Sequence, residues 1–114
     1  MRHRPPAAGA GDRKEAGARI LEGAALTSLG EATLALGRPA SAVGHYEAAL
    51  RIANDSGDLY TQGRSHEGLG LARRALGERD AAAAHLGAAL RLYTRLGQPL
   101  ADALRARLDA LAAH

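Results

Sequence analysis

The sequence contains no cysteine, no phenylalanine and no tryptophan, and only 3% of its 114 residues are aromatic. The absence of cysteine excludes a disulfide framework, a thiolate zinc site and a cysteine nucleophile. Without phenylalanine or tryptophan, a core must be built by close packing of small side chains. No apolar run approaches the roughly 18 residues of a membrane-spanning helix. We therefore expect no membrane association.

Alanine and leucine supply most of the hydrophobic residues, which make up 46% of the chain. Because β-branched residues are few, this composition favours helix over strand and predicts an all-α fold. A chain of this length is one domain or a piece of one. The formal net charge is +3, and Lys14 is the only lysine. An arginine-rich composition of this kind is as typical of a GC-rich genome as of a nucleic-acid partner, so we expect no direct nucleic-acid binding.

The first 14 residues show no hydrophobic period. Two prolines and two glycines stand among alanines and charged residues there, which predicts a disordered tail over residues 1–14. A nucleic-acid-binding arm is less favoured because few charges and aromatics are involved. The apolar run over residues 20–26 is short and carries a glutamate. We therefore expect no secretory signal and a cytoplasmic location.

Residues 22–58 align with residues 62–98 without a gap, which gives a repeat of 40 residues. The matches include glycines and a histidine that an alanine-rich composition would not align by itself. They are Gly23 with Gly63, Leu29-Gly30 with Leu69-Gly70, Ala35-Leu36-Gly37 with Ala75-Leu76-Gly77, His45 with His85, and Ala48-Ala49-Leu50-Arg51 with Ala88-Ala89-Leu90-Arg91.

Each copy of the repeat is predicted to form two helices joined by a short turn. The first pair covers residues 15–56, and the second covers residues 57–97. A fifth, capping helix follows over residues 98–114. Helices joined by short turns pack antiparallel with their neighbours in the chain. The predicted architecture is therefore an antiparallel array of helix hairpins, an α-solenoid of about five helices.

Glycine and aspartate mark the predicted helix ends. Gly37 and Gly77 end the first and third helices, and Asp58 and Asp80 are predicted N-caps of the third and fourth. Intervals of three and four residues define a predicted core face on each helix. In chain order these faces are Leu21, Ala25, Leu29, Ala32 and Leu36; Ala42, Val43, Tyr46, Ala49, Leu50 and Ala53; His66, Leu69 and Ala72; Ala82, Ala83, Leu86, Ala89, Leu90 and Tyr93; Leu100, Leu104, Leu108 and Leu111.

The repeats resemble the tetratricopeptide repeat family, whose unit carries a Leu-Gly step and later an alanine and an aromatic residue. Leu29-Gly30 and Leu69-Gly70 match the first feature, and Ala42 with Tyr46 matches the second. The departures are Thr33 and Arg73, which stand where an aromatic residue is usual. The resemblance implies a noncatalytic module that binds a protein or a peptide.

The period of 40 residues exceeds the usual length of about 34. Units of this length are similar to the C-terminal repeats of actinobacterial antibiotic-regulatory-type transcriptional regulators. The likeness rests on residues 35–38, 45–50 and 96–99, and on the ending over residues 104–111. It implies that the chain is the C-terminal part of such a bacterial regulator, or a fragment related to one.

No catalytic motif converges in the sequence. His66-Glu67 begins like a helical zinc-protease motif, but Gly70 stands where the second histidine is required. The glycines of Gly68-Leu69-Gly70 lie within a predicted helix, where they let the next helix approach closely, and not after a strand as in a dinucleotide loop. His45 and His85 are one repeat apart and are predicted to be surface or inter-repeat residues that do not converge. We therefore expect no enzyme, no cofactor and no metal.

A DNA-binding helix-turn-helix is the remaining alternative reading of the two helices around Gly77. The same pattern recurs around Gly37, so it belongs to the repeat. Residues 81–84 are four alanines, which cannot read base edges.

In the tetratricopeptide family the first helix of each pair lines a concave groove that contacts a peptide or a partner helix. The resemblance implies groove contacts at Ala24 and at seven further residues. These candidate contacts are Thr27, Glu31, Leu34, Arg64, Glu67, Leu71 and Arg74. The lysines and asparagines of a clamp for chaperone tails are absent from these positions.

A second hypothesis stays open, because solenoids generally need about three repeats for stability. An oligomerisation or packing module without a diffusible ligand would also explain the apolar first helix and the unpaired fifth helix. Self-association is therefore the alternative to a protein or peptide partner.

Overall fold

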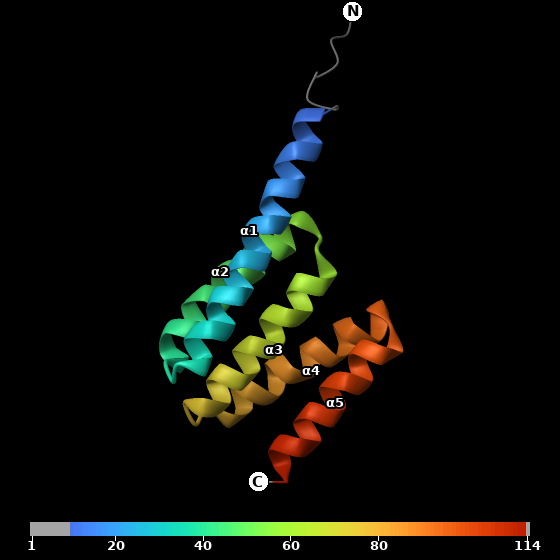
Figure 1. Cartoon of the computed structure of the whole chain (residues 1–114). Helices are drawn as coiled ribbons and strands as arrows, with labels where there is room; N and C mark the ends of the chain where they lie inside the picture. Colours follow the sequence, from blue (N-terminus) through green and yellow to red (C-terminus); the bar gives the residue numbers. More distant parts are fainter. Residues whose placement is uncertain (1–9, 114) are drawn as a thin grey trace, which may run out of the picture.

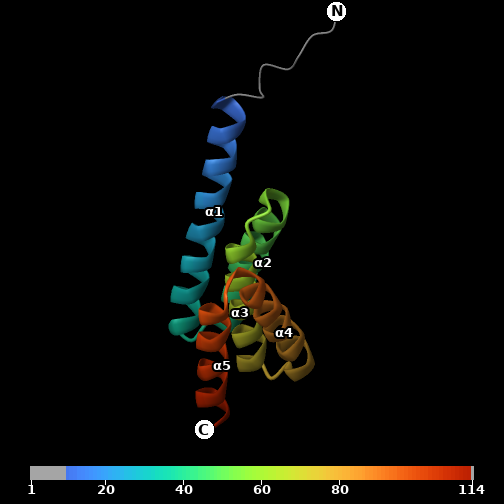
Figure 2. The same cartoon turned by 90° about the vertical axis from the view of Figure 1, so that its right-hand side faces the viewer.

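A computed structural model describes residues 10–113 of the chain. Over this range five helices follow one another: α1 (Ala10–Ala35), α2 (Pro39–Ser56), α3 (Leu59–Ala75), α4 (Arg79–Leu96) and α5 (Gln98–Ala112). Figures 1 and 2 show them as stacked antiparallel hairpins, with α5 at the end of the stack. The predicted all-α array of helix hairpins is confirmed.

The first helix begins earlier than the sequence predicts. Residues 10–14, assigned above to a disordered tail, form the start of α1. Helix propensity explains this extension towards the N-terminus, because strong helix formers stand at Arg13, Lys14, Glu15 and Ala16. They extend the helix although none of them belongs to the predicted core face. The part of the tail prediction that concerns residues 1–9 lies outside the described range.

The glycines predicted to end helices do so by the same hydrogen-bonded turn in both repeats. Gly37 and Gly77 have φ angles of +78° and +80°, in the left-handed region that favours glycine. In each turn the next backbone amide donates to the carbonyl five residues back, at 3.1 Å and 2.9 Å respectively. This Schellman turn satisfies carbonyls that a helix end leaves unpaired.

The two predicted N-caps have different outcomes. Asp58 is the N-cap of α3, and its side chain accepts a hydrogen bond from the amide of Thr61 at 3.2 Å. Asp80 is not a cap, because α4 begins one residue earlier, at Arg79, and places Asp80 within its first turn. The residue before that start, Glu78, makes no side-chain cap bond.

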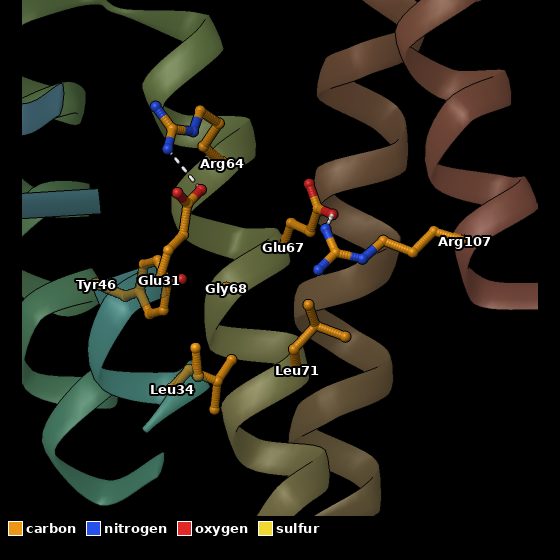
Figure 3. A pocket seen from close by; sticks show the side chains of 9 residues that line it. Glu31, Leu34, Tyr46, Arg64, Glu67, Gly68, Leu71 and Arg107 are labelled. Carbon is orange, nitrogen blue, oxygen red and sulfur yellow. Dashed lines mark hydrogen bonds and ion pairs between the residues drawn. The ribbon is translucent and has the colours of Figure 1, made fainter. Parts of the chain in front are cut away.

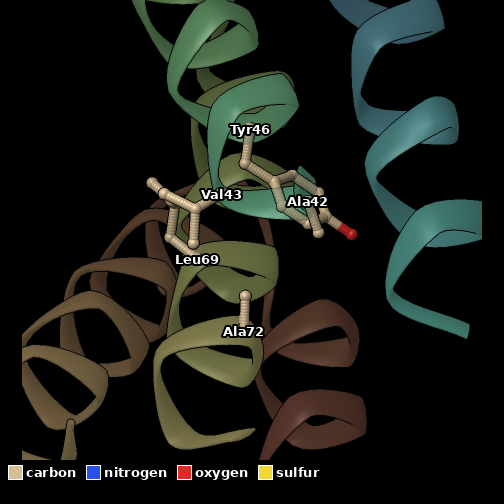
Figure 4. Close-up of a cluster of buried hydrophobic side chains, with 5 residues drawn as sticks. All are labelled: Ala42, Val43, Tyr46, Leu69 and Ala72. Carbon is tan, nitrogen blue, oxygen red and sulfur yellow. The ribbon is translucent and has the colours of Figure 1, made fainter. Parts of the chain in front are cut away.

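The core consists of two small clusters, each between consecutive helices. In the first, Ala42, Val43 and Tyr46 of α2 pack against Leu69 and Ala72 of α3 (Figure 4). The second joins α4 to α5 and consists of Ala89, Tyr93, Ala101 and Leu104. Tyrosine rings thus fill the volume that a larger domain would fill with phenylalanine, as the composition requires.

The predicted core face of α1 is wrong. Leu21, Leu29 and Leu36 are 72%, 48% and 73% exposed. The residues that α1 buries lie on the opposite face and are small: Gly23, Thr27 and Gly30. The spacing correctly placed the leucines on one side of a helix, but small residues let α1 approach its neighbours closely, so the leucines point to solvent.

Three smaller differences concern α2 and α4. Leu50 is only half-buried, although it packs against the first cluster. Ala83, predicted to be in the core, is exposed. Ile52 was not predicted and is 8% exposed, because the buried face of α2 is broader than the stripe read from the sequence.

Candidate functional site

A cavity of about 480 Å³ opens between the first helices of the two pairs and the capping helix. Its walls come from α1, α2, α3 and α5, which are brought together by the stacking of the hairpins (Figure 3). It is lined by Glu31, Leu34, Ala35, Tyr46, Arg64, Glu67, Gly68, Leu71 and Arg107.

One ion pair joins α1 to α3 at the cavity wall. Nη2 of Arg64 donates to Oε2 of Glu31 at 2.5 Å. The Arg64 side chain is 21% exposed and that of Glu31 is 56% exposed, so the arginine is the more enclosed partner. The guanidinium carbon of Arg64 also lies 5.9 Å from the ring centre of Tyr60, a cation–π distance.

A second ion pair joins α3 to α5. Nη1 of Arg107 donates to Oε2 of Glu67 at 2.7 Å, and the hydroxyl of Tyr93 donates to Oε1 of the same carboxylate at 2.9 Å. Burial raises the pKa of Tyr93, and the neighbouring Glu67 carboxylate raises it further. The phenol therefore stays protonated and holds Glu67 in place as a donor.

The Glu67–Arg107 pair stands between the cavity and a smaller hollow of about 190 Å³. Both residues line both spaces. The hollow lies between α3, α4 and α5, and its other lining residues are Tyr60, Tyr93, Leu100, Ala103 and Leu104. We call the two spaces together the groove; the Glu67–Arg107 ion pair stands between them.

The floor of the cavity is formed by Tyr46. Its ring lies between Gly30 and Gly68, and a Cβ atom on Gly30 would be 2.8 Å from the ring carbon Cζ. The residue is 2% exposed, and its hydroxyl has no hydrogen-bond partner among the residues that the structure describes. Burial, reinforced by the Glu31 carboxylate, raises the pKa of Tyr46 to about 12. The hydroxyl is therefore a neutral, unpartnered donor at the cavity.

Leu34 of α1 and Leu71 of α3 supply the apolar part of the lining (Figure 3). Both side chains are half-buried. With them, the cavity has leucines at one end, ion pairs at the other and a phenol hydroxyl between.

Five of the seven predicted groove residues meet in this cavity: Glu31, Leu34, Arg64, Glu67 and Leu71. The first helices of the two pairs therefore contribute residues to one common space.

The other two predicted contacts lie elsewhere. Thr27 is 0% exposed, and its hydroxyl donates to the carbonyl of Ala24 at 2.7 Å. It cannot contact a partner, because it occupies the face on which α1 packs. Arg74 is exposed and donates to the carbonyl of Leu111 at 3.2 Å. It ties α3 to α5 and does not line the cavity.

Sequence reasoning missed four residues of the cavity: Ala35, Tyr46, Gly68 and Arg107. Tyr46 was predicted only as a core residue, because its position in the repeat is a packing position. Arg107 was missed because it lies on α5, and its pairing with Glu67 spans 40 residues of the chain. Nothing in the sequence specifies how closely α5 returns to α3.

The histidines form a pair that the sequence did not predict. Nδ1 of His66 lies 3.0 Å from Nδ1 of His85, across the contact between α3 and α4. Burial lowers the pKa of both rings; that of His66 is lowered further by His85 and Arg91, and that of His85 by Arg73. No hydrogen bond or ring contact joins His45 to His85 among the described residues. No group of three or more potential metal ligands occurs within residues 10–113.

Comparison with known families gives one match. A family described as Tetratricopeptide repeat matches residues 19–95, well over half of the chain. Neither the curated proteins nor the solved structures give a match. Among the described helices, none combines the length and apolar character that a bilayer span requires.

Proposed function

Because the chain belongs to the tetratricopeptide repeat family, we propose that the groove between α1, α3 and α5 binds a short segment of a partner protein. Repeats of this family serve as protein-interaction modules and are in general noncatalytic. To this general role we add a specific binding site, the groove, and the chemistry of the segment that it binds.

The observation that carries the proposal is the cavity lined by Glu31, Leu34, Arg64, Glu67 and Leu71. Residues chosen from repeat position alone, two on α1 and three on α3, line one cavity. The Tyr46 hydroxyl, which makes no hydrogen bond to a described residue, adds a donor at this cavity.

The lining indicates the kind of segment that would fit. Leu34 and Leu71 would receive an apolar side chain, and the Tyr46 hydroxyl would donate to a peptide carbonyl. The ionic lining consists of two arginines and two glutamates, so it favours neither a strongly acidic nor a strongly basic peptide. We therefore propose a mixed segment with one apolar anchor.

A random-peptide phage library selected on the immobilised wild-type chain tests the proposal. Enriched peptides should lose binding to Arg64→Glu, which places two carboxylates at the wall of the cavity. The double variant Glu31→Arg/Arg64→Glu restores an ion pair with reversed polarity, so it should fold as the wild type and still bind poorly. Arg51→Glu is the matched control, because Arg51 on α2 is exposed and lines neither space.

Equal capture of the selected peptides by all four proteins would contradict the groove, and so would the absence of any enriched peptide. Circular dichroism of each variant separates loss of binding from loss of fold.

We also propose that the module acts in transcriptional regulation. The support is the likeness of residues 35–38, 45–50 and 104–111 to repeats of actinobacterial antibiotic-regulatory-type regulators. An adjacent reading frame that encodes a winged-helix or ATPase domain would support this role. A neighbourhood that is unrelated to regulation would count against it.

A further inference from the structure

The leucines of α1 form an apolar surface that the fold leaves open. Leu21 and Leu36 are 72% and 73% exposed, and Leu29 between them is 48% exposed. Ala25 and Ala32 share this side of the helix and are also exposed. We call these five residues the outer face of α1, although Leu36 directly follows the last residue of the helix. It lies opposite the face that packs against α2 and α3, so it is separate from the groove.

The equivalent face of the second repeat is buried. Leu69 is the counterpart of Leu29 and is 1% exposed, and Ala72 is the counterpart of Ala32 and is 0% exposed. In α3 this face is covered by α2, through Ala42 and Val43. The outer face of α1 is therefore the same helix-packing surface one repeat earlier, and no helix within residues 10–113 covers it.

The counterparts at the other end of the face follow the same rule. Thr61 and Ser65, which correspond to Leu21 and Ala25, are 3% and 0% exposed. Here the buried positions of α3 are polar, whereas the exposed positions of α1 are apolar. A helix surrounded by water is expected to carry polar residues at its exposed positions. Leu21 is instead exposed at the position where α3 buries Thr61.

We infer that the outer face of α1 binds the same face of a second copy of this chain, with the two α1 helices antiparallel. The order Leu, Ala, Leu, Ala, Leu reads almost the same in both directions. When Leu21 of one copy lies opposite Leu36 of the other, Ala25 lies opposite Ala32, and the two Leu29 side chains meet near a twofold axis. Such a contact closes on itself, as most homodimers do.

The side chains on this face suit close packing of two helices. Alanine at two of the five positions lets the helix axes approach, and the leucines on either side interdigitate. No member of the face is charged, so two copies bring no like charges together.

Analytical ultracentrifugation over a range of concentrations tests the dimer. The wild type should change from the mass of one chain to that of two, and Leu29→Asp should remain monomeric at every concentration. Leu96→Asp makes the same change at a leucine that is 41% exposed on α4, so this control should dimerise as the wild type does. Leu36→Asp, at a more exposed position, repeats the test if Leu29→Asp unfolds. A wild type that stays monomeric at high concentration, or an aspartate variant of α1 that dimerises normally, would overturn the inference.

Introduced cysteines test the register, because the chain has none of its own. An oxidised mixture of Ala25→Cys and Ala32→Cys should give mainly the mixed disulfide dimer, since these positions face each other. Each variant alone should crosslink several-fold less, because its two cysteines lie about two helical turns apart. Equal crosslinking of the single variants and the mixture would overturn the antiparallel arrangement.

Discussion

The ring of Tyr46 on α2 lies so close to Gly68 on α3 that no side-chain carbon fits between them. We expect Gly68→Ala to destabilise the fold by about 1–3 kcal/mol, because the added methyl group displaces the ring. Gly44→Ala is the control. Gly44 is an exposed helical glycine of α2 with nothing within 4 Å of its missing Cβ, so this change should stabilise by about 0.5–1 kcal/mol.

Urea denaturation gives both values. A Gly68→Ala variant as stable as the wild type would mean that the Tyr46 ring does not pack as described.

Removal of the Tyr46 hydroxyl should affect peptide binding but not the stability of the fold. We expect Tyr46→Phe to leave the free energy of unfolding almost unchanged, because the hydroxyl has no partner within residues 10–113. The binding free energy of this variant for a peptide selected on the wild type should weaken by about 1 kcal/mol, the net value of one hydrogen bond. Tyr93→Phe provides the contrast, since the Tyr93 hydroxyl donates to Glu67 at 2.9 Å. Its loss should lower stability by about 1.5–3 kcal/mol. Calorimetric titration and thermal unfolding together check the pair.

The two aspartates near helix starts should differ in their effects on stability. Asp58→Ala removes the bond to the amide of Thr61 and should cost about 1 kcal/mol. Asp80→Ala removes no cap bond and only weakens the interaction of an exposed carboxylate with the helix dipole, so it should cost about 0.3 kcal/mol. Equal losses in parallel denaturation curves would contradict this assignment of the caps.

The histidine pair predicts how stability depends on pH. The folded-state pKa values of His66 and His85 lie below the unfolded value of about 6.5. The unfolded chain therefore binds more protons in the interval between them. The stability contributed by the neutral pair is complete above about pH 6.5, and it is lost as the pH falls from there through the folded values. Denaturation midpoints measured at successive pH values should show this fall.

Replacing one partner of the histidine pair should flatten the pH dependence. In His85→Gln only one ring remains, and the repulsion between two protonated rings is gone. Ser41→Ala, at an exposed and uncharged position of α2, is the control and should keep the slope of the wild type. An unchanged slope in His85→Gln would contradict the histidine pair as the origin of the pH dependence of stability.

The sequence predicted the helices and their ends well, because these are local properties. The glycine turn at Gly37 recurs at Gly77, and the Asp58 cap depends on residues three positions apart. The face of α1 could not be predicted in the same way. Periodicity shows that Leu21, Leu29 and Leu36 share a side, but it does not show which neighbouring helix, if any, lies there.

The residues of the candidate site show the same difference between local properties, which the sequence predicts, and helix docking, which it does not. Glu31 and Arg64 were predicted from their positions in the repeat. Thr27 lies one helical turn before Glu31 on the same side of α1. At that point α1 packs against its neighbouring helices, so Thr27 is buried. Arg107 and the His66–His85 contact depend on the docking of whole helices, and no local pattern encodes that docking.

The groove is tested most directly by methyl NMR of the leucines during titration with a peptide selected on the wild type. Our account predicts that the methyl signals of Leu34 and Leu71, which line the cavity, shift and saturate with the peptide. Those of Leu36 and Leu96, which lie outside it, should stay in place. Shifts confined to Leu36 and Leu96, with Leu34 and Leu71 unchanged, would contradict the assignment of the groove as the binding site.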